Sequence, residues 1–250
     1  MTTAEFSNEF DVLAQSYLRE GGFTVSDSSL LAFNEYEKSV YLTREQENLV
    51  IALYSGNSIY GGFELTEQLR RDLDKLLADA VLEPVKKNGK HIADKSQWFA
   101  LPDGKDGNPK LWYIVYEAAA YADDAKIKNC PEDTESFPVE VIPVTYDDFH
   151  RIRGNPFRGP SRRRALRLDK GKDGSNYVEL VPKDTLGQYY VKYLRRPDPI
   201  ILTNLGDLTI NGESGPVECC LNESLHRLIL DGAVRAAISS RIPSSNDGKS

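Results

Sequence analysis

The sequence predicts an α+β protein, a helical-bundle core with a β-rich (antiparallel) insertion and a C-terminal helix. Apolar residues recur at helical spacing over the first 85 residues and again near the C-terminus. Between residues 96 and 193 the pattern changes to short alternating runs separated by turn residues. We therefore expect four parts: residues 1–90 as the first part of the helical core, 91–196 as the insertion, 197–240 as the segment whose helix completes the core, and 241–250 as a polar tail.

The first helix is predicted to begin at a capping box. Thr2 and Glu5 have the spacing at which each side chain satisfies the other residue's backbone N–H. Apolar residues follow at helical spacing: Phe6, Phe10, Leu13 and Tyr17. The pair Gly21-Gly22 is expected to end this helix.

Two more helices are expected before residue 85. Thr43 and Gln46 repeat the capping-box spacing, and Gly56 is a plausible stop. The stripe of this second helix is Leu42, Leu49, Val50 and Leu53. The third helix is expected from about Leu65, before Pro84, with its apolar face formed by Leu69, Leu73, Leu76, Leu77 and Ala80.

The insertion is predicted to be a set of strands joined by tight turns. Residues 98–101 and 111–118 flank the turn sequence PDGKDGNPK, which predicts a hairpin. Residues 165–168 and 177–181 flank DKGKDGSN, which predicts another. Phe137 to Val144 is a further candidate strand, and a short helix is expected from Tyr146 to Ile152.

The last strand of the insertion runs from Gln188 to Leu194, where Tyr189, Val191 and Tyr193 alternate with the other side chains. Arg195 and Arg196 end it, and Pro197 and Pro199 require an extended exit because proline lacks the N–H of a ladder. Two arginines beside a stiff apolar exit predict a surface for docking. The alternative is an ordinary edge strand with a charged end.

The C-terminal helix is expected to be capped by Asn222, with Glu223 at the positive end of its dipole. Its apolar stripe is Leu225, Leu228, Ile229, Ala233 and Ala236. The small residues of its second half predict that another helix approaches closely.

Composition excludes several classes of protein. The chain of 250 residues has a net charge of -7 and three cysteines, so neither overall attraction to nucleic acid nor a disulfide framework is expected. The sequence shows neither an apolar run of about 20 residues that would span a membrane nor a signal peptide, so we expect synthesis in the cytoplasm. Phosphate-binding and hydrolase motifs are absent too. We therefore predict no enzymatic activity and no cofactor.

One short cluster carries the residue types of a metal site. Asp147, Asp148 and His150 lie within four residues and could contribute ligands to a metal-dependent hydrolase or nuclease. The acidic start of a short helix explains the two aspartates equally well, because carboxylates stabilise the positive end of the helix dipole.

The strongest local charge lies between residues 151 and 172. Nine basic residues face one acid, Asp169, and the run includes Arg158, Arg162, Arg163, Arg164 and Arg167. Arginine suits the phosphates of DNA and also the carboxylates of another subunit. A solvated basic hairpin is the third interpretation. An acidic segment such as residues 131–135 is one candidate partner for this run.

Four stretches, taken together, resemble a known family. NEYEKSVYLTREQENLVIALYSGN, YDDFHRIRGNPFRGPSRRRALRLD, YYVKYLRRPDPIILT and LNESLHRLILDGAVRAAI are similar, in this order, to ring proteins of the head-to-tail connector in crAss-like bacteriophages. More broadly, they resemble adaptor proteins below the portal in short-tailed phages.

The resemblance implies a virion structural protein, a homo-oligomer whose closed, twelvefold ring lies beneath the portal and extends the DNA channel. Its partners would be the portal protein, further tail and ring proteins, and the viral DNA passing through the lumen. The predicted contact residues are Arg195, Arg196, Pro197, Arg158, Arg162, Arg163, Arg164 and Arg167. The alternative function is a DNA-binding accessory factor that uses the basic run.

Overall fold

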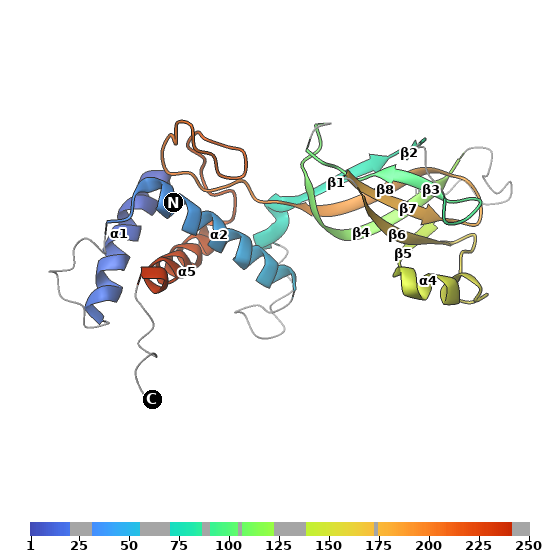
Figure 1. Cartoon of the computed structure of the whole chain (residues 1–250), viewed down its shortest axis with the longest axis horizontal. Coiled ribbons are helices and arrows are strands. Elements are labelled where there is room, and N and C mark those ends of the chain that lie inside the picture. The colour runs from blue at the N-terminus through green and yellow to red at the C-terminus, as the bar shows by residue number, and fades with distance from the viewer. Residues whose placement is uncertain are drawn as a thin grey trace, which may run out of the picture. The chain divides into compact units, whose positions relative to one another are not determined.

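The computed structural model describes residues 1–20, 32–55, 71–86, 91–104, 107–122, 139–172 and 175–241. Helices and strands are both present, which confirms the α+β class. The chain forms two compact units (Figure 1). The helical unit comprises Met1–Leu76 and Pro197–Ser250, and the sheet unit comprises Leu77–Arg196.

Helix α1 (Thr3–Glu20) begins as predicted. The Thr2 N–H donates to Glu5 Oε2 at 2.7 Å, and the Glu5 N–H donates to Thr2 Oγ1 at 3.3 Å. Phe6 and Phe10 are fully buried. The predicted stop at Gly21-Gly22 lies outside the described residues.

Helix α2 (Glu35–Tyr54) begins earlier than predicted. Its N-cap is Asn34, whose side chain accepts from the Glu37 N–H, while the Glu37 side chain accepts from the Asn34 N–H. The predicted start at Thr43 is therefore wrong, and Thr43 and Gln46 lie buried in the middle of the helix. The predicted apolar stripe does face the core.

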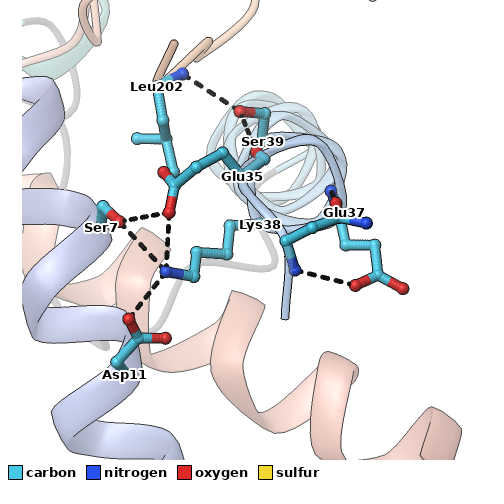
Figure 2. A network of polar contacts seen from close by, with 8 residues as sticks. Ser7, Asp11, Glu35, Glu37, Lys38, Ser39 and Leu202 are labelled. Atoms are coloured by element: carbon cyan, nitrogen blue, oxygen red, sulfur yellow. Dashed lines mark hydrogen bonds and ion pairs between the residues drawn. The ribbon is translucent and has the colours of Figure 1, made fainter. Parts of the chain in front are cut away.

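A buried lysine ties α1 to α2 (Figure 2). The Lys38 side chain is 3% exposed, and its ammonium lies 2.8 Å from Asp11 Oδ2 and 2.9 Å from Glu35 Oε1. It also donates to Ser7 Oγ at 3.1 Å. Burial alone would lower the pKa of Lys38, but the two carboxylates outweigh burial and raise it.

Helix α5 (Glu223–Arg241) packs against both α1 and α2. Leu225, Ile229 and Ala233 are fully buried as predicted, whereas Leu228 and Ala236 of the predicted stripe are only half-buried. Helix α2 is the helix that approaches α5, and the Glu45 side chain of α2 occupies the space beside Gly232. The predicted polar tail lies outside the described residues, apart from Arg241.

The third predicted helix is wrong at its C-terminal end. Its first residues, up to position 70, lie outside the described residues. Residues 71–73 are helical as predicted, and a short 3-10 turn (Asp74–Leu76) follows. Leu77 and Ala80 then belong to strand β1 (Leu77–Leu82), so the strands begin before residue 91. The helical spacing was misleading here because Leu76 and Ala80 are both buried but belong to different elements, the 3-10 turn and β1.

The strands of the described residues form one sheet of eight strands. They are β1, β2 (Pro84–Val85), β3 (Gln97–Ala100), β4 (Leu111–Tyr121), β5 (Val139–Pro143), β6 (Arg164–Lys172), β7 (Ser175–Val181) and β8 (Leu186–Arg195). Their order is β1-β8-β4-β5-β6-β7-β3-β2. Because only Glu83 separates β1 from β2, the sheet curves until its two ends meet.

Two expectations about strand pairing need correction. The strands flanking PDGKDGNPK form no hairpin: β3 pairs with β2 and β7, and β4 pairs with β5 and β8. The sheet is also not wholly antiparallel, since β5 pairs with β6 in parallel. A parallel pair needs a crossover, and helix α4 (Tyr146–Arg153) provides it (Figure 1). The β6–β7 hairpin is confirmed.

Strand β8 is central and not an edge strand. It pairs with β1 on one side and β4 on the other. Tyr189, Val191 and Tyr193 are fully buried, as their alternation predicts. They belong to the main core of the sheet unit, while Phe149 of α4 packs in a smaller core with Leu166 and Leu168.

Candidate functional site

The basic run is divided between buried and exposed residues. Arg167 is only 11% exposed, and its Nη1 lies 3.2 Å from Glu117 Oε2 while its Nε lies 3.2 Å from Asp169 Oδ1. Lys170 lies 2.7 Å from the buried Glu179. The structure thus places Arg167 within the sheet unit's own packing rather than on its surface.

The partner of Arg167 is itself largely shielded from water, with a side chain that is 10% exposed. Burial raises the pKa of Glu117 above its ordinary value, although Arg167 and the Tyr189 hydroxyl act in the opposite direction. Tyr189 donates to Glu117 Oε2 at 2.7 Å, and burial likewise raises the pKa of Tyr189. Arg167 neutralises a carboxylate that the sheet has removed from water.

The exposed part of the run is the segment 154–163, which we call the arginine loop. Arg158, Arg162 and Arg163 are exposed, and Phe157 is 86% exposed. Among the described residues, the side chains of these three arginines form no ion pair. The loop therefore presents one large apolar side chain among three positive charges.

The arginine loop is held by its own hydrogen bonds. Asn155 Oδ1 accepts from the Phe157 N–H at 2.8 Å and from the Arg158 N–H at 3.2 Å. The guanidinium of Arg164 donates to the Phe157 carbonyl at 2.6 Å and lies 3.8 Å from Glu140. Arg164 is thus a support of the loop more than part of its exposed surface.

Two further contacts fix the path of the loop. The Gly159 N–H donates to the Asn155 carbonyl at 2.7 Å, and a Cβ at position 159 would come within 2.7 Å of that oxygen. Tyr121 donates from its hydroxyl to the Arg162 carbonyl at 2.7 Å. A Cβ at position 159 would overlap these backbone oxygens, so this path of the loop requires glycine there.

The second predicted contact surface lies where β8 ends. Arg196 is exposed, Arg195 is half-buried, and Pro197 is buried. Both arginines already take part in interactions within the chain. Of the three predicted residues, Arg196 is the one whose side chain is most accessible to a neighbour.

The chain beyond Pro197 docks on helix α2. Ser39, Thr43 and Gln46 lie on one face of the helix, and each is buried. The Leu202 N–H donates to Ser39 Oγ at 3.1 Å (Figure 2), the Ile200 N–H donates to Thr43 Oγ1 at 3.0 Å, and Gln46 Nε2 donates to the Asp198 carbonyl at 2.7 Å. Three side chains of α2 thus bind every second residue of an extended segment.

Cys219 also contacts Gln46, the residue of α2 that binds the Asp198 carbonyl. Its thiol donates to Gln46 Oε1 at 3.2 Å, and burial raises the pKa of Cys219 to about 12. The thiol therefore stays protonated near neutral pH and acts as a donor. Sequence reasoning missed this contact because Thr43 and Gln46 were interpreted as a cap. Three polar residues at helical spacing, 39, 43 and 46, were the available signal.

The acidic cluster of α4 has a structural role. Thr145 caps the helix by accepting from the Asp148 N–H at 3.3 Å, and Asp148 pairs with Arg151 at 2.6 Å. In the part of the chain that the structure describes, Asp147, Asp148 and His150 belong to no group of side chains that could hold a metal ion. Within the same residues, each helix is too short or too polar to cross a bilayer.

Comparison with known proteins shows that the chain is similar in sequence to phage tail components over nearly its whole length. Residues 1–249 match the family model described as phage tail ring protein 3/4. The chain is 40% identical over 245 residues to "Ring protein 3" of Bacteroides phage crAss001, covering 96% of each. It is 33% identical over 245 residues to "Ring protein 4/5" of that phage, covering 95% of this chain and 92% of the relative. The similarity spans both units.

Proposed function

Because the chain belongs to the phage tail ring protein 3/4 family, we propose that it forms a ring of the connector that joins a phage head to its tail. Membership confirms the resemblance seen in the sequence: the chain is a virion structural ring protein and not an enzyme. The match over residues 1–249 carries the proposal, since it includes the helical and the sheet unit alike.

In the proposed assembly, twelve copies form a closed ring below the portal, and the ring extends the channel through which the viral DNA passes. The helices α1, α2 and α5 would be the bundle core of an adaptor, and the sheet unit would reach neighbouring components. The net charge of -7 supports a lumen role, because like charges keep DNA from adhering to the wall.

The mass of the assembly formed with portal protein tests this function. We expect native mass spectrometry of the two purified proteins together to show a complex with twelve copies of this chain. A chain that stays monomeric alone and never joins portal protein at any ratio would contradict the proposal.

Reversing the charge at the end of β8 is expected to impair assembly. With Arg195→Glu and Arg196→Glu together, we expect association about tenfold weaker, because a surface that meets acidic side chains would then repel them. Sedimentation velocity measures the assembled fraction, and circular dichroism checks that the monomer is folded.

The matched control replaces both arginines with lysine, which keeps the charge at the same positions. Assembly at the wild-type level in the lysine pair and its loss in the glutamate pair would support a contact at this surface. Normal assembly of the glutamate pair would mean that Arg195 and Arg196 serve the fold alone.

The exposed arginines also support the alternative of a DNA-binding accessory factor. Arg158, Arg162 and Arg163 can each neutralise one phosphate, so binding to duplex DNA would weaken with a log–log salt slope of about -3. A gel-shift series from low to physiological salt measures this slope. No shift at the lowest salt excludes this function.

A further inference from the structure

The arginine loop carries a feature that its charge does not explain. Phe157 is 86% exposed and stands between Arg151–Arg153 of α4 and the arginines at 158, 162 and 163. A folded chain gains nothing by holding a phenyl ring in water. Arginine and aromatic residues together are typical of the anchor points of protein interfaces.

The rigidity of the loop points the same way. The Asn155 side chain, the Arg164 guanidinium and the close packing at Gly159 fix the backbone on both sides of Phe157. A loop that is already ordered loses little conformational entropy when it binds. The segment is therefore prepared to insert Phe157 into a partner without rearrangement.

The kind of partner follows from charge and from the phenyl ring. Phosphates would satisfy the arginines and leave Phe157 in water, whereas a protein surface with carboxylates around an apolar side chain satisfies both. The helical unit is the acidic one of the two: it contains 20 acidic and 10 basic residues, a net charge of -10. The sheet unit contains 18 acidic and 21 basic residues, a net charge of +3.

The outer face of α1 has the required pattern. Val12 is 66% exposed, and its neighbours on the same face include the exposed side chains of Asn8 and Glu9, with Glu5 one turn further. Within α1 four acids accompany one base, Arg19. This face thus presents an exposed apolar side chain with the Glu9 carboxylate beside it and Glu5 beyond, which can complement Phe157 among arginines.

We propose that the arginine loop of one copy docks on the outer face of α1 of the neighbouring copy, with Phe157 against Val12 and the arginines on the carboxylates. The inference rests on the proposed ring, because a contact between two different surfaces of identical chains repeats until it closes. It identifies both halves of the contact that holds adjacent subunits together.

Two charge-reversal variants of the full chain test the pairing. The loop variant carries Arg162→Glu and Arg163→Glu, and the helix variant carries Asn8→Lys and Glu9→Lys, all at exposed positions. Alone, each variant places like charges at every contact, so we expect self-association at least about 100-fold weaker than wild type by sedimentation equilibrium. Mixed at equal amounts, alternating copies pair opposite charges, and assembly should return.

The mixture separates a contact between copies from one within a chain, because only a contact between copies is rescued by mixing. Lys86→Glu with Lys183→Glu is the matched control for the loop variant. It makes the same change of charge as the loop variant, at exposed positions of the sheet unit outside the arginine loop. It should assemble like wild type. Phe157→Ser should weaken association by about tenfold and leave the unfolding midpoint unchanged.

The outcomes distinguish this contact from the ring itself. If wild type assembles and the loop variant assembles equally well, the ring stands and the docking of the arginine loop on α1 is wrong. The same follows if each variant fails alone and their mixture fails too. If wild type shows no association at any concentration, alone or with portal protein, both the ring and the contact are wrong.

Discussion

Replacing Glu179 with leucine is expected to lower the free energy of unfolding of the sheet unit by about 3–5 kcal/mol. Glu179 is fully buried, and three groups depend on it: the Lys170 ammonium at 2.7 Å, the Ile92 N–H at 2.8 Å and the Ser96 hydroxyl. Leucine would leave a largely buried ammonium without its carboxylate, and a backbone N–H without an acceptor.

The two tryptophans allow the unfolding of the sheet unit to be measured separately from that of the helical unit. Trp98 and Trp112 both lie in the sheet unit, so tryptophan fluorescence during urea unfolding follows that unit alone. The Lys170 ammonium also lies 3.9 Å from the centre of a Trp98 ring, which places the probe beside the change. Glu179→Gln is the matched control, because glutamine keeps the size of the side chain and one acceptor oxygen. It should lower the free energy of unfolding by less than Glu179→Leu does.

The same carboxylate predicts how stability depends on pH. Burial alone would raise the pKa of Glu179, but the contacts from Lys170, Ser96 and Ile92 outweigh burial and hold this pKa below 4.5. Between the pKa of Glu179 in the folded chain and its higher pKa in the unfolded chain, the unfolded chain binds a proton more readily. The stabilisation by the Glu179 carboxylate is therefore present above pH 4.5 and is lost as pH falls through the pKa of the folded chain. The difference between wild type and Glu179→Gln should shrink upon acidification, and an unchanged difference would contradict this account.

Replacing Thr43 with valine is expected to destabilise the helical unit by about 2–5 kcal/mol. The Thr43 hydroxyl accepts from the Ile200 N–H at 3.0 Å and donates to the Ile200 carbonyl at 3.2 Å, and Ile200 is fully buried. Valine has nearly the same shape, so it removes one hydroxyl and leaves two backbone groups buried without a partner.

Ellipticity at 222 nm is the measurement, since α1, α2 and α5 of the helical unit dominate it. Thr43→Ser retains the hydroxyl and loses a methyl group, so it should cost about 1 kcal/mol. If serine and valine destabilise equally, the contribution of Thr43 is packing and the two hydrogen bonds to Ile200 add little.

Features fixed by neighbouring residues were predictable from the sequence. The capping box of Thr2 and Glu5, the short helix after Thr145, and the β6–β7 hairpin all depend on groups within a few positions of each other. The alternation of Tyr189, Val191 and Tyr193 was equally informative. In a strand, every second side chain lies on the same face of the sheet, so the alternation identifies the residues that share a face.

The errors arose where the deciding partner is distant in the chain. Asn34 and Glu37 also have the capping pattern, and only the docking of Ile200 shows why Thr43 is buried and is not a cap. Strand β3 pairs with β7, which begins 75 residues after the end of β3, rather than with the strand across the next turn.

The candidate site also has a part that the sequence predicts and a part that depends on distant residues. The sequence located the basic run but could not separate Arg167 from Arg162, because the burial of Arg167 depends on Glu117, which is 50 positions away. The exposure of Phe157 was not predictable either, since an isolated phenylalanine between arginines is compatible with a core position.

The first and last strands of the sheet unit carry a consequence for how such proteins can diversify. Leu77, where the chain enters this unit, lies directly opposite Leu194 near its exit, because β1 and β8 are antiparallel neighbours. Entry and exit are thus separated by about one strand spacing, roughly 5 Å. A module whose ends meet in this way can be exchanged, enlarged or excised as a cassette, while the interrupted helical chain is resealed with a few residues.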